Sequence, residues 1–372
     1  MSEQILITGG AGFIGSHLAD ELLRAGYRVR ALDNLSPQVH GPEAKRPSYL
    51  APEVELMVGD VRDRAEVRRA LEGCSAVVHL AAMVGVGQSM YRVEDYTSTN
   101  AGGTAVLLEA LAEHPVERLV VASSMSVYGE GLYRRPGGEP VEGQSRPLEQ
   151  LRLGDWEVRG PDGNALTPVP TPETKVLSLE SVYALSKYDQ ERLCLILGRA
   201  YGIPTVALRL FNVFGPRQAL SNPYTGVLAI FASRLLNQSP PLIFEDGLQQ
   251  RDFVSVYDVA RAFRLALTRD GIDGEVLNIG SGAPRTILDV ARSMRQVLAR
   301  RGPAEEVTGR YRMGDVRHCF ADVSRARRVL GYQAEVPFEV GLTELSGWLE
   351  GQVARDRVAE ARAELEQRGL TL

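Results

Sequence analysis

Residues 4–15 read QILITGGAGFIG, an apolar run followed at once by a cluster of glycines. Gly9, Gly12 and Gly15 satisfy the spacing G-x-x-G-x-x-G, and the pattern after them predicts a helix over residues 15–27. Glycines let a strand turn tightly into a helix, and they let the backbone approach a pyrophosphate at the positive N-terminus of that helix. The stretch therefore predicts a dinucleotide-binding turn after the first strand of an α/β fold.

Asp33 ends the next expected strand, YRVRALD at 27–33, and indicates which dinucleotide binds. A carboxylate at this place hydrogen-bonds the adenosine ribose diol and repels a 2′-phosphate, so NAD is favoured over NADP. Two later strand ends supply further expected contacts. Asp60, in GDVRD, is expected to face the adenine, and the small residues of HLAA at 79–82 let the cofactor lie close.

Short β-branched runs alternate with helical periodicity as far as residue 210. Further strands are expected at 54–60, 76–81, 118–124 and 205–210, and helices at 64–73 and 100–114. This alternation predicts an α/β fold, a Rossmann-type doubly wound parallel sheet with a smaller C-terminal α/β lobe. The expected division is an NAD-binding domain at 1–212, the smaller lobe at 213–350, and a charged, solvated helix at 351–372.

Residues 130–179 interrupt the alternation and are rich in proline, glycine and charge. A segment of this length without clear periodicity is too long for an ordinary connection, so we expect an excursion inserted in the first domain. Its role is open between a lid or interface element and a surface loop with local turns.

Composition and charge exclude several classes of protein. Hydrophobic residues make up 44% of the 372 and the net charge is -5, so neither nucleic acid nor a membrane is expected as a partner. The three cysteines form no C-x-x-C pair, which argues against a disulfide framework or a zinc cluster. The N-terminus lacks the pattern of a secretory signal, and no apolar run reaches the roughly 20 residues of a membrane span. A cytoplasmic protein is therefore predicted.

Tyr183 and Lys187, in YALSK, lie four residues apart and share one face of an expected helix. A tyrosine with the ordinary pKa of about 10 is a poor base at neutral pH. A nearby ammonium and the positive nicotinamide of NAD both favour the phenolate. Behind a dinucleotide turn, this pair predicts a tyrosine that acts as a general base.

Together these motifs resemble the extended short-chain dehydrogenase/reductase family, in its nucleotide-sugar epimerase/dehydratase branch. The resemblance rests on Asp33 and on TGGAGFIG (8–15), HLAA (79–82), SSMSVYG (123–129), YALSK (183–187) and RLFNVFGPR (209–217). It extends to about residue 350, apart from the excursion. It implies that the protein is an NAD-dependent enzyme whose substrate is a nucleotide-diphosphate sugar.

The resemblance also implies roles for individual residues. Tyr183 removes a proton from a sugar hydroxyl, Lys187 holds the nicotinamide ribose and lowers the pKa of the tyrosine, and Ser124 hydrogen-bonds the same sugar oxygen. The implied NAD contacts are Gly9, Gly12, Phe13, Ile14, Gly15, Asp33, Asn34, Asp60, Val61, Leu80, Ala81, Ala82, Asn100, Tyr183, Lys187 and Phe211. The implied substrate contacts are Val84, Ser124, Asn212, Leu242, Arg251, Arg312 and Asp315.

Met125 and Ser126 bear on which reaction the protein catalyses. Members of this branch first oxidise a sugar carbon, and the 4,6-dehydratases carry an Asp-Glu pair directly after the serine or threonine at position 124. Decarboxylating relatives usually place a glutamate there. Met125 and Ser126 cannot act as a general acid and base pair. The favoured function is therefore an NAD-dependent nucleotide-sugar 4-epimerase that inverts C4 through a transient 4-keto sugar.

The sugar and the nucleotide are less defined than the reaction. Segments such as LDNLSPQVHG (32–41) and FEDGLQQRDFVSV (244–256) particularly resemble dTDP-L-rhamnose 4-epimerases. UDP-glucuronate and UDP-glucose/galactose 4-epimerases share the catalytic residues. A nucleotide-sugar 4-ketoreductase or dehydrogenase keeps them too, and a 4,6-dehydratase is a weaker alternative. A non-catalytic NAD-binding regulator is a rival of another class, against which the intact Ser–Tyr–Lys set argues.

Two expectations concern assembly and metal. In this family the helices that match residues 100–114 and 181–201 pair across a two-fold axis, so the resemblance implies a homodimer. Some relatives carry a zinc-knuckle-like C-P-x-C-G in the excursion, where this chain has RGPDG at 159–163. We therefore expect no bound metal.

Overall fold

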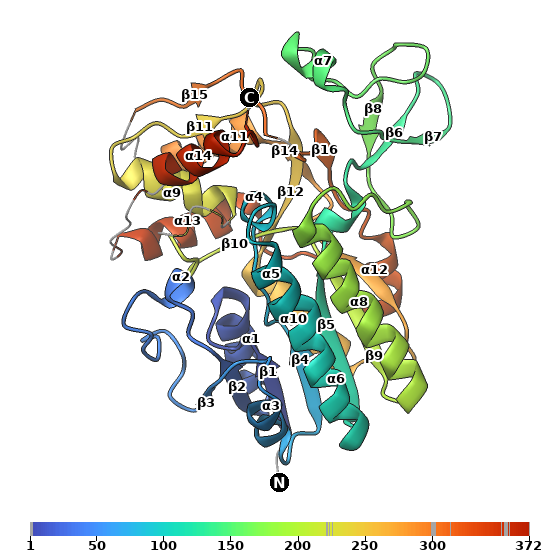
Figure 1. The fold of residues 1–372 in the computed structure, drawn as a ribbon, viewed down its shortest axis with the longest axis vertical. Helices are drawn as coiled ribbons and strands as arrows, with labels where there is room; N and C mark the ends of the chain where they lie inside the picture. The colour runs from blue at the N-terminus through green and yellow to red at the C-terminus, as the bar shows by residue number, and fades with distance from the viewer. Residues whose placement is uncertain are drawn as a thin grey trace.

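A seven-stranded parallel sheet lies at the centre of the larger lobe in the computed structural model (Figure 1). The model describes residues 3–220, 222, 224, 226–298, 303–312, 314–350, 352, 356 and 358–371, with only the backbone of residue 359. The sheet order is β13-β9-β5-β4-β1-β2-β3, and each neighbouring pair is parallel. Its strands are β1 (Gln4–Thr8), β2 (Arg28–Asp33), β3 (Glu55–Val58), β4 (Ala76–His79), β5 (Arg118–Ser124), β9 (Thr205–Leu210) and β13 (Val276–Ile279). The predicted doubly wound α/β fold is confirmed.

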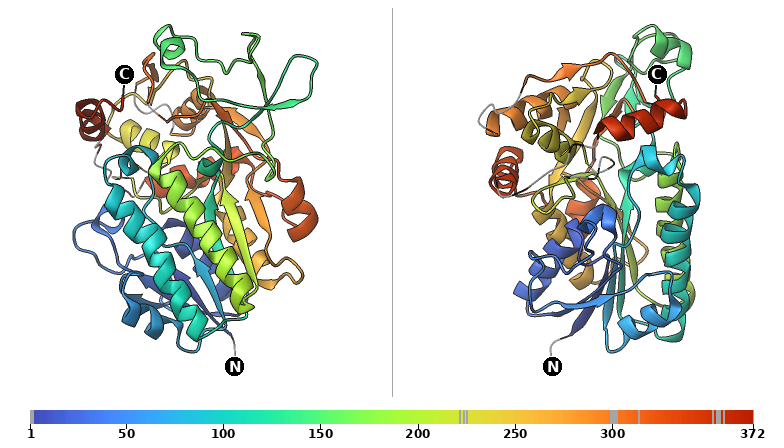
Figure 2. Two further views of the ribbon diagram at one scale, coloured as in Figure 1. Left: turned by 45° about the vertical axis from the view of Figure 1, so that its right-hand side comes forward. Right: turned by 60° about the vertical axis from the view of Figure 1, so that its left-hand side comes forward.

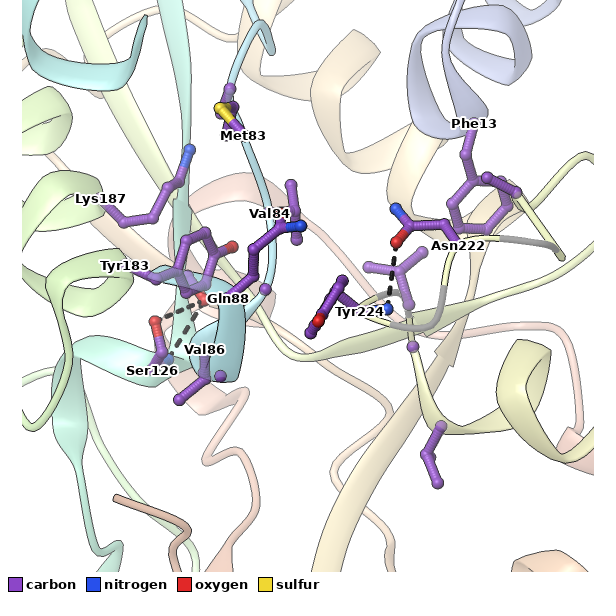
Figure 3. Close-up of a pocket in the computed structure, with 18 of the residues that line it drawn as sticks. Phe13, Met83, Val84, Val86, Gln88, Ser126, Tyr183, Lys187, Asn222 and Tyr224 are labelled. Atoms are coloured by element: carbon purple, nitrogen blue, oxygen red, sulfur yellow. Dashed lines mark hydrogen bonds between the residues drawn. The ribbon is translucent and has the colours of Figure 1, made fainter. Parts of the chain in front are cut away.

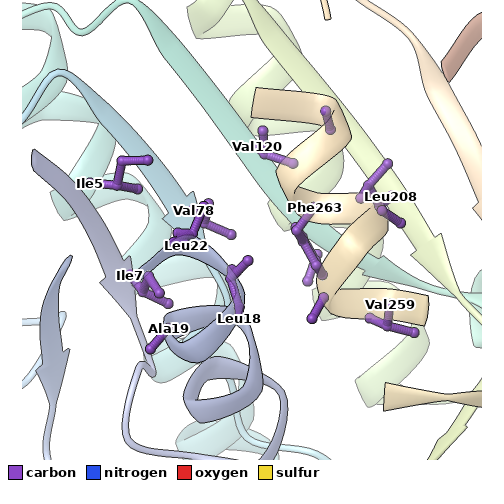
Figure 4. Packing of buried hydrophobic residues seen from close by; sticks show 14 of the residues in the cluster. Ile5, Ile7, Leu18, Ala19, Leu22, Val78, Val120, Leu208, Val259 and Phe263 are labelled. Atoms are coloured by element: carbon purple, nitrogen blue, oxygen red, sulfur yellow. The ribbon is translucent and has the colours of Figure 1, made fainter. Parts of the chain in front are cut away.

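Helices cover both faces of this sheet, as Figure 2 shows. One face packs against α1 (Phe13–Arg24) and α10 (Val256–Thr268), and the other against α3 (Arg64–Leu71), α6 (Gly103–Glu113) and α8 (Val182–Tyr201). Alternate residues of β1 explain the arrangement, because successive side chains of a strand point to opposite faces. Ile5 and Ile7 join the core under α1 (Figure 4), whereas Leu6 joins the core under α6.

The turn after β1 requires its glycines. Gly9 has a φ of 71°, and a Cβ there would lie 2.9 Å from the backbone nitrogen of Ala81. A Cβ on Gly15 would collide with the carbonyl oxygen of Gly9. The turn therefore packs directly against the segment after β4. Since β1 and β4 are where the strand order reverses, their carboxyl ends form the crevice in which such folds bind ligands.

β13 and α10 differ from the predicted division of the chain. Both come from residues 213–350, which the sequence assigned to the smaller lobe, but β13 pairs with β9 and α10 packs against α1. A further helix from this segment, α12 (Ser324–Leu330), packs against β13. The reason is that β9 would otherwise be an exposed edge of a sheet whose strands are apolar on both faces. The chain thus returns to the first lobe after it has begun the second.

The smaller lobe packs helices around two short sheets. Its helices are α9 (Val227–Leu236), α11 (Ile287–Val297) and α13 (Phe338–Leu349), and they share one apolar core with β11 and β12. One sheet contains β10 (Asn212–Phe214), β12 (Gln250–Ser255), β14 (Pro284–Thr286) and β16 (His318–Cys319), and the other pairs β11 (Leu242–Ile243) with β15 (Glu306–Val307). The short elements of the larger lobe are α2 (Pro37–His40), α4 (Val86–Ser89), α5 (Val93–Tyr96) and two turns of other helix types, η1 (Thr97–Gly102) and η2 (Met125–Tyr128).

The excursion is more regular than its sequence indicated. It contains α7 (Leu148–Arg152) and a three-stranded antiparallel sheet of β6 (Leu132–Arg134), β7 (Pro140–Glu142) and β8 (Thr167–Val169). Arg317 fastens it to the smaller lobe. This guanidinium is fully buried and pairs with Glu157 of the excursion at 2.6 Å and with Glu245 at 2.9 Å. The fold thus places the excursion beside the smaller lobe.

The C-terminal helix also differs from its prediction. α14 (Val358–Gln367) is charged as expected, but Ala361 and Leu365 are each only 8% exposed. The helix is therefore packed against the rest of the protein along one side rather than solvated all round. In the described part of the chain, no helix combines the length and the apolar character that a membrane crossing requires.

Candidate active site

A cavity of about 860 Å³ opens between the carboxyl ends of the large sheet and the smaller lobe. In Figure 3, Tyr183 and Lys187 of α8 lie on one side of it, and Phe13, Asn222 and Tyr224 lie on the other. The predicted site residues that line this cavity are Gly9, Gly12, Phe13, Ile14, Gly15, Asp33, Asn34, Val61, Leu80, Ala81, Ala82, Val84, Ser124, Tyr183, Lys187, Phe211, Asn212, Leu242, Arg251, Arg312 and Asp315. Asp60 and Asn100 were predicted to contact NAD but do not line it.

The end of the cavity at the glycine turn fits NAD. A Cβ on Gly12 would meet only the Gly9 carbonyl oxygen, at 3.3 Å, so the backbone is open to a close ligand. The Asp33 carboxylate accepts hydrogen bonds from the backbone nitrogens of Ala11, at 3.0 Å, and Leu35, at 2.9 Å. These bonds hold the carboxylate at the cavity wall, where it has lone pairs left for a ribose diol and repels a further phosphate.

Asp60 and Asn100 support the cavity from behind. The Asp60 carboxylate pairs with Arg62 at 2.8 Å, and this hydrogen bond lowers the pKa of Asp60 to about 2. Asp60 also accepts from Asn34, so it positions two residues of the lining, and its contact with the adenine stays a prediction. Asn100 lies in the π-helical turn η1 and exchanges hydrogen bonds with both backbone groups of Met83. It thereby fixes the segment that follows β4.

Ser124 and Tyr183 come together in the cavity wall at the carboxyl end of β5. Ser124 ends β5, and its Oγ accepts hydrogen bonds from the backbone nitrogen of Ser126 at 3.2 Å and from the Ser126 hydroxyl at 3.0 Å. Tyr183 lies in the first turn of α8, which Ser181 caps by accepting from the nitrogen of Ala184. Burial raises the pKa of Tyr183, and a hydrogen bond with Ser124 opposes that rise.

Lys187 is buried one turn along α8 from Tyr183. Its ammonium donates to the side-chain oxygen of Gln190 at 2.7 Å. Burial lowers the pKa of Lys187 from 10.5 to about 8, although Cys194 and Glu191 nearby favour the charged form. A positive charge near the phenol stabilises the phenolate. At neutral pH the lysine therefore still supplies the charge that the predicted base needs.

Gln190 connects this lysine to the strands of the sheet. Its amide nitrogen donates to the carbonyl oxygen of Ala81 at 3.2 Å and to the hydroxyl of Thr104 at 3.0 Å. Thr104 also contacts a ring nitrogen of His79 at 2.8 Å, and the other ring nitrogen contacts Thr8 at 2.7 Å. Burial lowers the pKa of His79 to about 3, so the ring is neutral. The hydrogen-bonded network behind Lys187 therefore consists of neutral side chains, those of Gln190, Thr104 and His79.

The far end of the cavity carries the predicted phosphate-binding arginines. Arg251 is only 8% exposed and donates to the carbonyl oxygens of Gln250, at 2.9 Å, and Arg317, at 3.0 Å. Arg312 pairs with Asp315 at 3.0 Å. Backbone carbonyl groups therefore orient the guanidinium of Arg251, and the carboxylate of Asp315 orients that of Arg312.

Several groups that line the cavity or support it were not predicted from the sequence, and three of them bear directly on the site. Ser126 was considered only as a missing acid, although it orients Ser124. Gln190 has a signal in the sequence, because it follows Lys187 by three residues on the same helix face. The third group comes from the C-terminal segment, namely Val358, Ala361, Arg362, Leu365, Leu370 and Thr371. No local motif indicates that this segment reaches the cavity.

A glycine turn, an acid after β2 and a buried Tyr–Lys pair over one cavity define an NAD-dependent enzyme of the short-chain dehydrogenase type. The model of the NAD dependent epimerase/dehydratase family matches residues 5–150 and 160–280. The dTDP-L-rhamnose 4-epimerase of Burkholderia thailandensis is 36% identical over 360 residues, which cover 95% of this chain and 96% of that protein. A UDP-N-acetyl-alpha-D-glucosaminuronate decarboxylase of Bacillus cytotoxicus is 30% identical over 356 residues, covering 94% and 98%.

A solved structure agrees with these sequence relatives. The UDP-glucose 4-epimerase of Thermotoga maritima, crystallised with UDP-glucose, has a TM-score of 0.75 and 30% identity, covering 93% of this chain and 98% of that one. The chain therefore belongs to the NAD-dependent epimerase/dehydratase family. The predicted family, enzyme class and NAD cofactor are confirmed.

Asp33→Asn tests the assignment of the cofactor preference. The variant keeps an oxygen acceptor but loses the negative charge, so we expect the preference for NAD over NADP to fall about tenfold, or about 1.4 kcal/mol. Calorimetric titration of the cofactor-free protein with each dinucleotide measures the two affinities. An unchanged ratio would show that another group discriminates against the 2′-phosphate.

Lys187→Met tests the buried ammonium through stability. Between pH 8 and pH 10.5 the folded lysine is neutral while the unfolded lysine still binds a proton, so wild-type stability rises with pH in this window. We expect the difference in unfolding free energy, wild type minus Lys187→Met, to increase by about 2 kcal/mol from pH 8 to pH 10. Urea denaturation at each pH measures it. A difference that does not change with pH would mean that Lys187 titrates normally.

Proposed function

We propose that this protein is a nucleotide-sugar 4-epimerase, which inverts C4 of the sugar through a transient 4-keto form. The observation that carries the proposal is the meeting of Ser124, Tyr183 and Lys187 at one end of a cavity whose other end holds two arginines. A nucleotide sugar carries matching groups in the same order, with a sugar hydroxyl for the Ser–Tyr–Lys set and a diphosphate for the arginines. The residues that line the cavity suit such a ligand.

The chain supplies proton transfer and positioning. When bound, NAD⁺ would supply the two-electron chemistry, as the acceptor of a hydride from the sugar carbon that is later returned to it. The phenol oxygen of Tyr183 takes the proton of the C4 hydroxyl and later gives it back, and the charge on Lys187 keeps that oxygen acidic enough to do so. Ser124 hydrogen-bonds the same sugar oxygen, and Ser126 orients Ser124 through the bond between their hydroxyls.

Dehydration and decarboxylation are disfavoured by η2. Its first residues, Met125 and Ser126, follow Ser124 directly, and neither side chain carries an ionisable group. Elimination of a hydroxyl needs an acid and a base beside the keto sugar in addition to the tyrosine. The decarboxylase relative belongs to the same family, and the lack of an acid at positions 125 and 126 argues against its reaction in this chain.

For the substrate we propose a dTDP-6-deoxyhexose, of the dTDP-L-rhamnose/dTDP-6-deoxy-L-talose type. The support is the 36% identity with the Burkholderia thailandensis enzyme over almost the whole chain. UDP-glucose/galactose and UDP-glucuronate remain the alternatives, because their epimerases need the same catalytic residues. A net 4-ketoreductase is the second candidate function, since it uses the same Ser–Tyr–Lys set.

We further propose that two copies of the chain associate through α6 and α8. The support is the exposed apolar surface of α8, where Leu185 is 44% and Ile196 is 53% exposed. A second copy would cover both residues, and the family resemblance points to the same pairing of helices. The proposed site of action is the cytoplasm, and the absence of a bound metal remains a prediction.

Incubation with UDP-, dTDP- and GDP-sugars, followed by NMR, tests the proposed reaction. We expect C4 epimers of at least one substrate, without consumption of added NADH or NADPH. Tyr183→Phe removes the base, so its kcat is expected to fall at least about 100-fold while NAD still binds. Tyr201→Phe, an exposed position of the same helix, is the matched control. Stoichiometric consumption of reduced cofactor would instead identify a ketoreductase.

A further inference from the structure

The C-terminal segment 358–371 forms a wall of the substrate cavity. Figures 1 and 2 show α14 at the boundary of the two lobes, close to α4 of the larger lobe. Most of its cavity-facing residues are apolar, namely Val358, Ala361, Leu365 and Leu370. Leu365 packs on α4, because a Cβ placed on Gly87 would lie 3.5 Å from a methyl of Leu365. α4 also carries Ser89, whose hydroxyl accepts the backbone N–H of the catalytic Tyr183.

Glu364 ties this segment to both lobes. Its carboxylate accepts hydrogen bonds from the phenol of Tyr91, which follows α4, and from the phenol of Tyr224, at 2.8 Å, on the loop before α9. The two phenols also contact each other, at 2.6 Å. Glu366 adds an ion pair with Arg310 of the smaller lobe at 2.8 Å. Polar contacts to both lobes thus hold the segment along the cavity.

Thr371 brings a polar group to the phosphate end. Its backbone forms a β-bridge with Arg312, one of the two predicted phosphate-binding arginines. Its hydroxyl lies in the cavity wall and is buried, with the residue 8% exposed, yet it has no hydrogen-bond partner among the described residues. Gln218 and Asn212 line the same cavity, and each has a side-chain oxygen that is buried and likewise unpartnered there. Such groups are costly unless a ligand or water satisfies them.

We infer that residues 358–371 are part of the nucleotide-sugar site. Thr371 donates a hydrogen bond to the nucleoside diphosphate, and the apolar side of α14 closes over the bound substrate. Glu364 holds this wall in place through Tyr91 and Tyr224. The inference rests on the proposed function for the identity of the ligand, and it adds a binding element outside the residues 5–280 spanned by the family model.

The wall has a consequence for the proposed reaction. A 4-keto sugar must turn within the cavity before hydrogen returns to its other face. During that step its remaining hold on the protein is the nucleoside diphosphate. A closed wall at this end keeps the intermediate from leaving. An open wall lets the keto sugar escape into solution.

Thr371→Val tests the hydrogen bond, since valine keeps the shape and removes the hydroxyl. We expect the affinity for dTDP and UDP, measured by calorimetric titration, to fall about fivefold, as for one lost neutral hydrogen bond. NAD affinity should not change, which excludes a general loss of fold. Thr343→Val, at an exposed position of α13, is the matched control and should bind as the wild type does. Equal binding of dTDP and UDP by wild type and Thr371→Val would overturn the role of Thr371.

Glu364→Ala tests the wall itself. We expect free 4-keto nucleotide sugar to appear in solution during turnover, where hydroxylamine traps it and mass spectrometry detects the oxime. Gln367→Ala, exposed on the same helix, should release none beyond the wild-type level. Absence of trapped ketone from Glu364→Ala, with normal dTDP and UDP binding, would refute the wall. If the wild type binds neither nucleotide, the proposed function fails instead.

Discussion

The buried ammonium of Lys187 is the constraint around which the active site is arranged. A charge in the protein interior is costly, and the first partner it has is a neutral amide, the Gln190 side chain at 2.7 Å. That amide is fixed by Ala81 and Thr104, so α8 must pack closely against β4 and α6. A carboxylate partner would stabilise the lysine more strongly, but it would also cancel the charge that Tyr183 needs. The Gln190 amide leaves the charge of the lysine uncancelled, and that charge favours the phenolate against the rise in the Tyr183 pKa that burial causes.

The other residues of the cavity are arranged around Tyr183 in the same way. These residues all line one cavity. In the proposed function the glycine turn and Asp33 hold NAD and the two arginines with Asn212 hold the nucleotide sugar, so Tyr183 would lie where the two ligands meet. Ser124 and Ser126 add hydroxyls there, and the positions directly after Ser124 add no further acid or base. The proposed reaction needs proton transfer at one sugar oxygen, and this arrangement contains the groups for it. The inferred wall of residues 358–371 fits this reaction. The 4-keto sugar must turn in the cavity without leaving it, and the wall would hold it there.

Much of this could be predicted from local sequence. β5 and β9 occupy the predicted residues 118–124 and 205–210, because strands buried on both faces appear as continuous apolar runs. The Gly9 turn and the Tyr183–Lys187 spacing are also local, since each depends on a few neighbouring residues. The NAD cofactor and the family could be predicted from these features.

The features that were missed depend on distant contacts. β13 joins the first sheet because β9 has a free edge, which no motif near residue 276 records. Asn34, which donates to the Asp60 carboxylate, comes from a strand end 26 residues earlier in the chain. The sequence of α14 is mostly charged, so its narrow apolar side is hard to recognise. That Leu365 and Thr371 line the cavity is seen only in the folded protein. In each case the sequence supplied the residue and the fold supplied the partner.

Internal oxidation and reduction at C4 is the central claim, and an isotope label tests it most directly. A nucleotide sugar that the protein accepts is prepared with deuterium at C4 and incubated in ordinary water until its epimers equilibrate. The account predicts that both epimers retain the deuterium at C4 and that neither exchanges hydrogen at C3 or C5. Loss of the C4 deuterium to water would contradict it, because the carbon would then be inverted by proton exchange with solvent.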